Sequence, residues 1–237
     1  MTSKLLWLAA AAVLLAHPAT AQVPGSPPPP KETPHIVPPP VPGTEASATA
    51  RPRFPQLKLE QLTPEQKPLG EDVLKVSSVG LGGPYNILLR SPILEKRMFD
   101  MLYYLRWQTS VPTRLNEFAI LVISRPWKSQ VEWYAHAPLA EKAGLSPKIV
   151  AELKETGKRP SGMAEDEAVT YDFITELLAD KKLSDATFAR AKKVFTDQQI
   201  VDLTGVAGQY HMLAMLLAMG EQSIPPGRVE PFKASDK

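Results

Sequence analysis

A histidine with acidic residues before it is the first place in this sequence where side chains are spaced for chemistry. His136 follows Glu132 by four positions in the stretch SQVEWYAHAPLAEKAG, and Glu117 lies on the segment before it. Residues four apart share one face of a helix. The Glu132 carboxylate is therefore expected to hold the imidazole of His136 and to raise its pKa. An imidazole held in this way can donate or accept a proton near neutral pH.

Spacing alone leaves a second interpretation open for each of these residues. Glu132 and His136 could form an ordinary surface pair beside a core tryptophan. Glu117 could be a core carboxylate paired with Arg114 or Arg125. Apart from His136, the helical part of the chain has one other histidine, and the chain has no cysteine. With so few histidine and cysteine side chains to bind a metal ion, a metal site is not expected.

Two neighbouring helices must position the acids and the histidine. The segment 112–124 is apolar almost all round, which is typical of a buried helix, and Pro126 is expected to end it. The next helix is expected over 129–143. Gly144 would be its left-handed cap residue, and Pro138 would remove one backbone hydrogen bond inside it.

The remainder of the folded region also has helical patterns. The last helix opens with Thr196 and Gln199 in a capping-box arrangement. One of its faces carries small and methionine residues that would let a neighbouring helix approach, from the same chain or from another subunit. His211, on the same helix, is expected to be packed or at an interface. No segment has a convincing strand pattern, so the expected fold class is all-α. The further helices are expected over 91–108, 146–157, 163–180, 184–195 and 196–220.

The N-terminal part of the chain has a different composition from the rest. Lys4 and the apolar run 5–16 predict a secretory signal peptide over 1–21, and the run is shorter than the roughly 20 residues of a membrane span. An uncleaved anchor is the alternative. A Pro-rich disordered linker is expected over 22–56, the helical domain over 57–227 and a flexible tail over 228–237. The protein is therefore expected to be periplasmic or secreted, with no membrane span after signal cleavage.

The charge balance and the lack of cysteine argue against nucleic-acid binding and against thiol chemistry. The chain has 27 Lys and Arg against 25 Asp and Glu, and this near balance gives no case for nucleic-acid binding. It has no cysteine, so the chain itself has no thiol chemistry.

The sequence resembles the carboxymuconolactone decarboxylase family, which belongs to the same superfamily as the alkylhydroperoxidase-D-like proteins. The resemblance rests on GGPYNILLRSP, on RLNEFAILVISRPWKSQVEWYAHAPLAEKAGLS and on FTDQQIVDLTGVAGQYHMLAMLLAMGEQSIPPG. It implies an all-helical, alkylhydroperoxidase-D-like domain that assembles into homo-oligomers, as trimers or hexamers. The alkylhydroperoxidase branch carries Cys-x-x-Cys before its histidine, and those cysteines fall at Ser129 and Glu132 here. Its upstream glutamate falls at Glu117.

The decarboxylase branch has Glu-x-x-x-His at this place, which matches Glu132 and His136. The resemblance implies cofactor-free acid/base chemistry, of decarboxylase or lactone-processing type, on a small organic acid or lactone. In this scheme His136 donates the proton, Glu132 orients the imidazole of His136, and Glu117 completes the polar pocket. Neither a metal nor another cofactor is expected.

Three further residues are expected to bind the substrate. Trp133 and Tyr210 would shape an apolar wall, and Ser129 would face the substrate from the start of the helix. Two alternatives stay open. One is a small-molecule-binding or scaffold protein that has lost the chemistry, and the other is an alkylhydroperoxidase or peroxiredoxin-type activity, which the absence of cysteine disfavours. Because the chain begins like an exported protein, its substrate is expected to differ from carboxymuconolactone itself.

Overall fold

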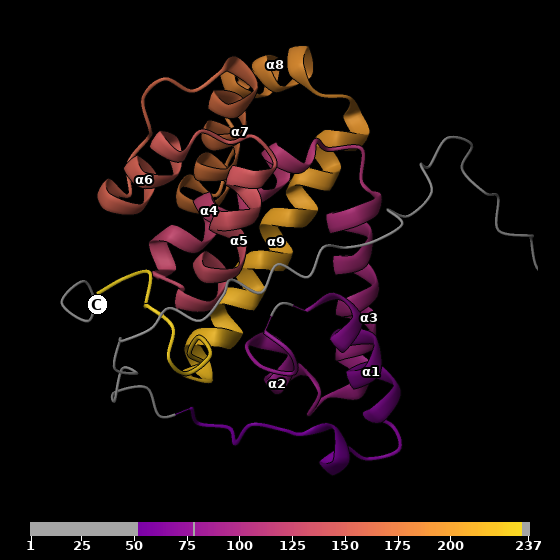
Figure 1. Cartoon of the computed structure of the whole chain (residues 1–237). Helices are drawn as coiled ribbons and strands as arrows, with labels where there is room; N and C mark the ends of the chain where they lie inside the picture. Colours follow the sequence, from indigo (N-terminus) through magenta and orange to yellow (C-terminus); the bar gives the residue numbers. More distant parts are fainter. Residues whose placement is uncertain (1–51, 78, 234–237) are drawn as a thin grey trace, which may run out of the picture.

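The computed structural model describes residues 52–77 and 79–233, and every regular element in these residues is helical (Figure 1). This confirms the all-α expectation. The expected signal peptide and most of the expected linker lie outside the described residues. The elements are η1 (Leu59–Gln61), α1 (Lys67–Val76), α2 (Pro84–Leu88), α3 (Pro92–Tyr103), η2 (Tyr104–Gln108), α4 (Thr113–Trp127), α5 (Gln130–Lys142), α6 (Pro147–Thr156), α7 (Glu165–Thr175), η3 (Glu176–Asp180), α8 (Asp185–Val194) and α9 (Asp197–Met219).

Helix α4 is the centre of the core. It packs against α5, α7 and α9, and all its residues from Leu115 to Ser124 are buried. A helix surrounded on three sides needs an apolar surface all round, and this explains the sequence of α4. The exceptions in this stretch are Asn116, Ser124 and Glu117, and of these only Glu117 is an acid.

Helix α9 runs the length of the molecule, with α3 on one side and α4 and α5 on the other (Figure 1). The predicted capping box is confirmed, because Thr196 Oγ1 accepts from the N–H of Gln199 and the Gln199 side chain accepts from the N–H of Thr196. By length and composition α9 could cross a membrane, which the sequence analysis did not foresee. The core helix of a folded domain passes the same test, and half of the apolar window of α9 is buried.

Both prolines near the acids are accommodated inside helices. Pro126 was expected to end its helix, but α4 continues to Trp127 and stops at Lys128, which has the left-handed φ of 47°. A proline in the last turn costs only one backbone hydrogen bond, which explains the extra residues. Pro138 lies inside α5 as expected, and Gly144 follows that helix with a φ of 101°.

The chain on either side of the helical domain is held against it. Arg53, in the expected linker, donates from its backbone N–H to the Gly220 carbonyl and pairs with Glu221. Phe232, in the expected flexible tail, is buried against Trp133. The tail prediction is therefore corrected for the described residues up to 233, because an aromatic side chain can anchor a segment that has no helix.

Candidate active site

Five elements deliver polar side chains to one buried region between α4, α5 and α9. Helix α4 supplies Glu117, and α5 supplies Glu132 and His136 one turn apart. The wide turn η2, which is π-helical, supplies Arg106. Such turns inside helices are frequent at functional sites. Tyr210 comes from α9, and α2 adds Tyr85.

The shortest contact in this region joins His136 and Glu117. His136 Nδ1 lies 2.6 Å from Glu117 Oε2, and both side chains are buried. Burial would raise the pKa of Glu117, but His136 and Arg106 more than offset it and hold that pKa below its ordinary value. With Glu117 ionised, Nδ1 carries the hydrogen of this bond. The other ring nitrogen, Nε2, makes no hydrogen bond to the described residues and is available as a base.

The expected contact between Glu132 and His136 is absent, which corrects the predicted role of Glu132. Both carboxyl oxygens of Glu132 are buried without a hydrogen bond to any described residue. Burial raises the pKa of Glu132 to about 8, and the nearby Ser129 hydroxyl opposes this rise only in part. Burial also lowers the pKa of His136, against the attraction of Glu117. At neutral pH Glu132 is therefore the protonated acid, and His136 is a neutral imidazole held by Glu117.

Arg106 provides the positive charge of the site, and sequence reasoning missed it. Its Nη2 donates to Glu117 Oε1 at 3.2 Å, while its buried Nε has no partner among the described residues. Burial opposes the charge, but Tyr210 and Glu117 stabilise it and raise the pKa of Arg106. The arginines expected as partners of Glu117 lie elsewhere: Arg114 pairs with Asp166 and Glu167, and Arg125 donates to backbone carbonyls of α6.

A partly open cavity of about 50 Å³ lies among these groups. A single water molecule needs at least about 10 Å³ of such space, so the cavity takes a head group of a few atoms. Its polar lining consists mainly of Arg106, Glu132, His136, Tyr85 and Tyr210, and its apolar lining includes Val131 and Leu213. Buried polar groups without protein partners normally find a water or a ligand, which makes this cavity the candidate site.

Of the three residues predicted to bind the substrate, the structure places one in the cavity lining and two outside it. Tyr210 lines the cavity, and its ring packs edge-on against the imidazole of His136 with centroids 5.1 Å apart. Trp133 points away from the cavity into the core, where it packs on Phe232. It is therefore not part of the wall, because it lies on a different face of α5. Ser129 is buried at the start of α5, beside Glu132 but outside the cavity lining.

A second buried acid shows what distinguishes Glu132. Glu95, on α3, is also buried with both oxygens unpartnered among the described residues, and burial raises its pKa to about 7. It does not line the cavity. A buried carboxyl group with a raised pKa is therefore found outside the candidate site as well. What distinguishes Glu132 is that it lines a cavity together with His136, the partner of Glu117.

No family model matches the sequence, and no curated protein matches it. The fold does match a solved structure, the alkylhydroperoxidase AhpD core of an uncharacterized peroxidase-related protein from Ralstonia eutropha JMP134. The TM-score is 0.61 at 15% sequence identity, and the match covers 76% of this chain and 97% of that chain. At this identity the likeness establishes the fold, so the chain has the AhpD-like helical core that the resemblance implied.

Proposed function

We propose that this protein is a cofactor-free acid/base catalyst, of carboxymuconolactone decarboxylase type, acting on a small organic acid or lactone. The observation that carries the proposal is the pairing of His136 with Glu117, 2.6 Å apart, beside a cavity lined by Glu132, a buried acid without a hydrogen-bond partner among the described residues. Groups whose surroundings move their pKa values in opposite directions are suited to act as an acid and a base.

The roles differ from those that the sequence implied. Glu132 is the proton donor, because its carboxyl group keeps its proton at neutral pH. His136 is the base through Nε2, and Glu117 holds the ring in the required tautomer, as the carboxylate does in a catalytic triad. Arg106 holds Glu117 and adds positive charge where an enolate oxygen develops.

In a decarboxylation the bond between the substrate carbon and its carboxylate breaks. The electron pair of that bond moves to a conjugated carbonyl of the substrate, and carbon dioxide leaves. Glu132 then gives its proton to the carbon, and water returns a proton to Glu132. In a lactone rearrangement His136 Nε2 takes a proton from the carbon beside the carbonyl, and Glu132 supplies a proton at another carbon.

The fold neighbour is described as peroxidase-related, so peroxide reduction is the competing activity. A thiolate-based route needs a cysteine, and this chain has none. Positions 129 and 132 carry Ser and Glu, which cannot exchange disulfides. We therefore favour proton transfer over peroxide reduction.

The experiment is a screen of lactones and oxo acids against the purified protein, with mass analysis of the products. Glu132→Gln and His136→Gln should each lower turnover of a discovered substrate about 10²- to 10⁴-fold. Glu95→Gln is the matched control, since it removes a buried acid outside the cavity and should leave turnover unchanged. Peroxide consumption with a dithiol reductant, or full turnover by Glu132→Gln, would overturn the proposal.

A further inference from the structure

A second hollow, of about 210 Å³, lies against the last turns of α4. Its walls come from α4, from the end of α6, from α7 with its π-helical continuation η3, and from His211 of α9. It shares no lining residue with the cavity of the candidate active site. This hollow, the α4–α7 pocket, is therefore a separate place in the fold, and the proposed function makes no use of it.

Most of the lining of the α4–α7 pocket is apolar. Val122, Ile174 and Leu178 contribute aliphatic side chains, and Trp127 and Tyr171 contribute aromatic rings. An apolar cavity of about 150 Å³ is enough to bind benzene. The α4–α7 pocket, at about 210 Å³, has room for a benzene ring with a small substituent.

The charge at the α4–α7 pocket favours an anion. Among the described residues, Arg125 is the only charged side chain in the lining, and no acid lines it. Arg125 Nε donates to the backbone carbonyls of Leu153 and Lys154, and its Nη atoms have no hydrogen-bond or ion-pair partner among the described residues. Gly157 lets the guanidinium come close, since a Cβ there would lie 3.2 Å from Arg125 Cζ. A guanidinium held by Nε with its Nη groups unengaged is suited to bind a carboxylate.

His211 supplies a second donor to the same pocket. The indole N–H of Trp127 donates to His211 Nδ1 at 3.3 Å, so the hydrogen of the neutral imidazole is on Nε2. Nε2 has no hydrogen-bond partner among the described residues. The two rings pack edge-on with centroids 5.2 Å apart, which helps to hold the imidazole in place. Donors from two different helices, α4 and α9, therefore belong to one mainly apolar pocket.

We propose that the α4–α7 pocket is a second ligand site, which binds a small aromatic carboxylic acid in its ionised form. The ring lies among the aliphatic side chains of α4, α7 and η3, and the carboxylate binds Arg125, with His211 as an additional donor. The inference concerns binding alone and does not rest on the proposed function.

A matched series of ring compounds tests the charge preference on the full chain. Benzoate, benzamide and benzylamine have nearly the same size and are negative, neutral and positive near neutral pH. Benzoate should bind at least about fivefold more tightly than benzamide, because a charge-assisted hydrogen bond is stronger than a neutral one, and benzylamine should bind most weakly. Calorimetry measures the three affinities. Equal affinities, or tightest binding of benzylamine, would overturn the proposal.

Acetate tests the contribution of the ring. It has the carboxylate without the apolar body and should bind about tenfold or more weakly than benzoate, because it buries far less apolar surface. Equal affinities of acetate and benzoate would show that no apolar pocket holds the ring, and would contradict the proposal.

Three variants locate the charge preference. Arg125→Gln should remove the preference for benzoate over benzamide. Thr175→Phe keeps Arg125 but places a larger side chain in the half-buried wall of the pocket, and should weaken benzoate and benzamide alike by about tenfold. Arg97→Gln is the matched control, since Arg97 is an exposed arginine on α3 that does not line the pocket. An equal loss of preference in Arg97→Gln and Arg125→Gln would assign it to the net charge of the protein and overturn the proposal.

Arg125 also binds the end of α6, so thermal unfolding of each variant shows whether it is folded. If Arg125→Gln does not fold, Thr175→Phe alone decides, and benzoate binding that this variant leaves unchanged would overturn the proposal.

Glu132→Gln distinguishes the α4–α7 pocket from the candidate active site. Glu132 does not line the pocket, so this variant should change benzoate affinity less than about twofold. Benzoate binding that is lost in Glu132→Gln and kept in Thr175→Phe would place the acid in the candidate active site instead. Failure to find any turnover would remove the proposed function and leave this binding result standing.

Discussion

Glu95 and Glu132 are both buried carboxylic acids without hydrogen-bond partners among the described residues, and only Glu132 faces a cavity. A buried carboxyl group keeps its proton to a higher pH than an exposed one, because burial penalises the charged form. At the candidate site this keeps Glu132 protonated near neutral pH, as the proposed role of proton donor requires. At Glu95 the same effect has a cost in stability and no evident chemical use.

The proposed acid and base predict a bell-shaped dependence of kcat/KM on pH. Activity should fall as the pH rises through about 8, where Glu132 loses its proton, and as it falls below 6.5, where His136 gains one. A pH profile for any discovered substrate checks this. The residual activity of Glu132→Gln should lack the alkaline limb, and an unchanged alkaline limb in that variant would assign it to another group.

Glu95→Gln should stabilise the protein at alkaline pH. The pKa of Glu95 is raised on folding, so the folded state binds more protons than the unfolded state and stability falls as the pH rises from about 4.5 to about 7. The amide cannot ionise, so the variant avoids this loss of stability, which is on the order of 3 kcal/mol. Thermal unfolding at pH 5 and pH 8 measures it. An equal effect of the substitution at both pH values would contradict the prediction.

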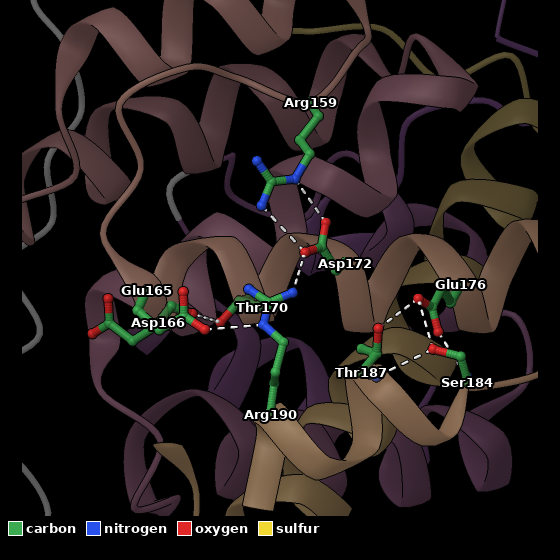
Figure 2. A network of polar contacts seen from close by, with 9 residues as sticks. All are labelled: Arg159, Glu165, Asp166, Thr170, Asp172, Glu176, Ser184, Thr187 and Arg190. Atoms are coloured by element: carbon green, nitrogen blue, oxygen red, sulfur yellow. Dashed lines mark hydrogen bonds and ion pairs between the residues drawn. The ribbon is translucent and has the colours of Figure 1, made fainter. Parts of the chain in front are cut away.

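Between elements, α7 and α8 are joined by a network of charged side chains (Figure 2). Asp172 accepts from Arg159 through both of its oxygens and from Arg190 through Oδ2, and Arg190 also pairs with Glu165. In η3, which directly follows α7, Glu176 accepts from Ser184 and Thr187 at the start of α8. These contacts hold α8 against α7, and α7 packs against α4, the core helix that carries Glu117.

Asp172→Asn should lower the free energy of unfolding by about 1 kcal/mol, since it breaks a network rather than one exposed pair. Burial opposes ionisation of Asp172, but Arg159 and Arg190 outweigh it and lower its pKa. The contribution is therefore present above the ordinary pKa of 3.8 and lost as the pH falls through the lowered value. Urea unfolding at neutral pH measures the difference.

Asp100→Asn is the control for this prediction, because Asp100 belongs to an exposed i,i+4 pair with Lys96. It should cost less than about 0.5 kcal/mol. An equal loss in both variants would show that the network adds nothing beyond single surface pairs.

The molecule as a whole leaves one face of α9 exposed. Val201, Met215 and Met219 are 68%, 44% and 43% exposed along this face, and Gly208 has open space around it. An apolar stripe of this kind on a long helix is typical of a contact with another subunit. The homo-oligomer that the resemblance implies is therefore a prediction centred on this face.

Val201→Asp with Met215→Asp should shift the protein to a smaller species, because two charges would be buried in the contact. Light scattering coupled to size-exclusion chromatography measures the mass. Thr156→Asp on α6 is the control, since it adds a charge to an exposed position far along the chain from α9. A wild-type protein that is already monomeric would contradict the prediction.

The sequence determined the helices and the acidic and histidine positions. Apolar periodicity, capping residues and the Gly144 turn predicted α3 to α9, because these signals act between neighbours in the chain. The spacing of Glu132 and His136 predicted that they share a helix, and the resemblance placed Glu117 with them. No helix was predicted where α2 lies, since its five residues are too few to show a helical period.

Only the tertiary structure decided which groups meet. The contact of His136 with Glu117 joins two helices, and Arg106 reaches Glu117 from a π-helical turn. Neither contact has a local signal in the sequence. The protonation of Glu132 also depends on tertiary structure, because a pKa is set by the burial and charges that surrounding elements impose. Residue types and their order along the chain thus named the candidate residues, and packing decided which of them meet, which of them keep a proton and where the cavity lies.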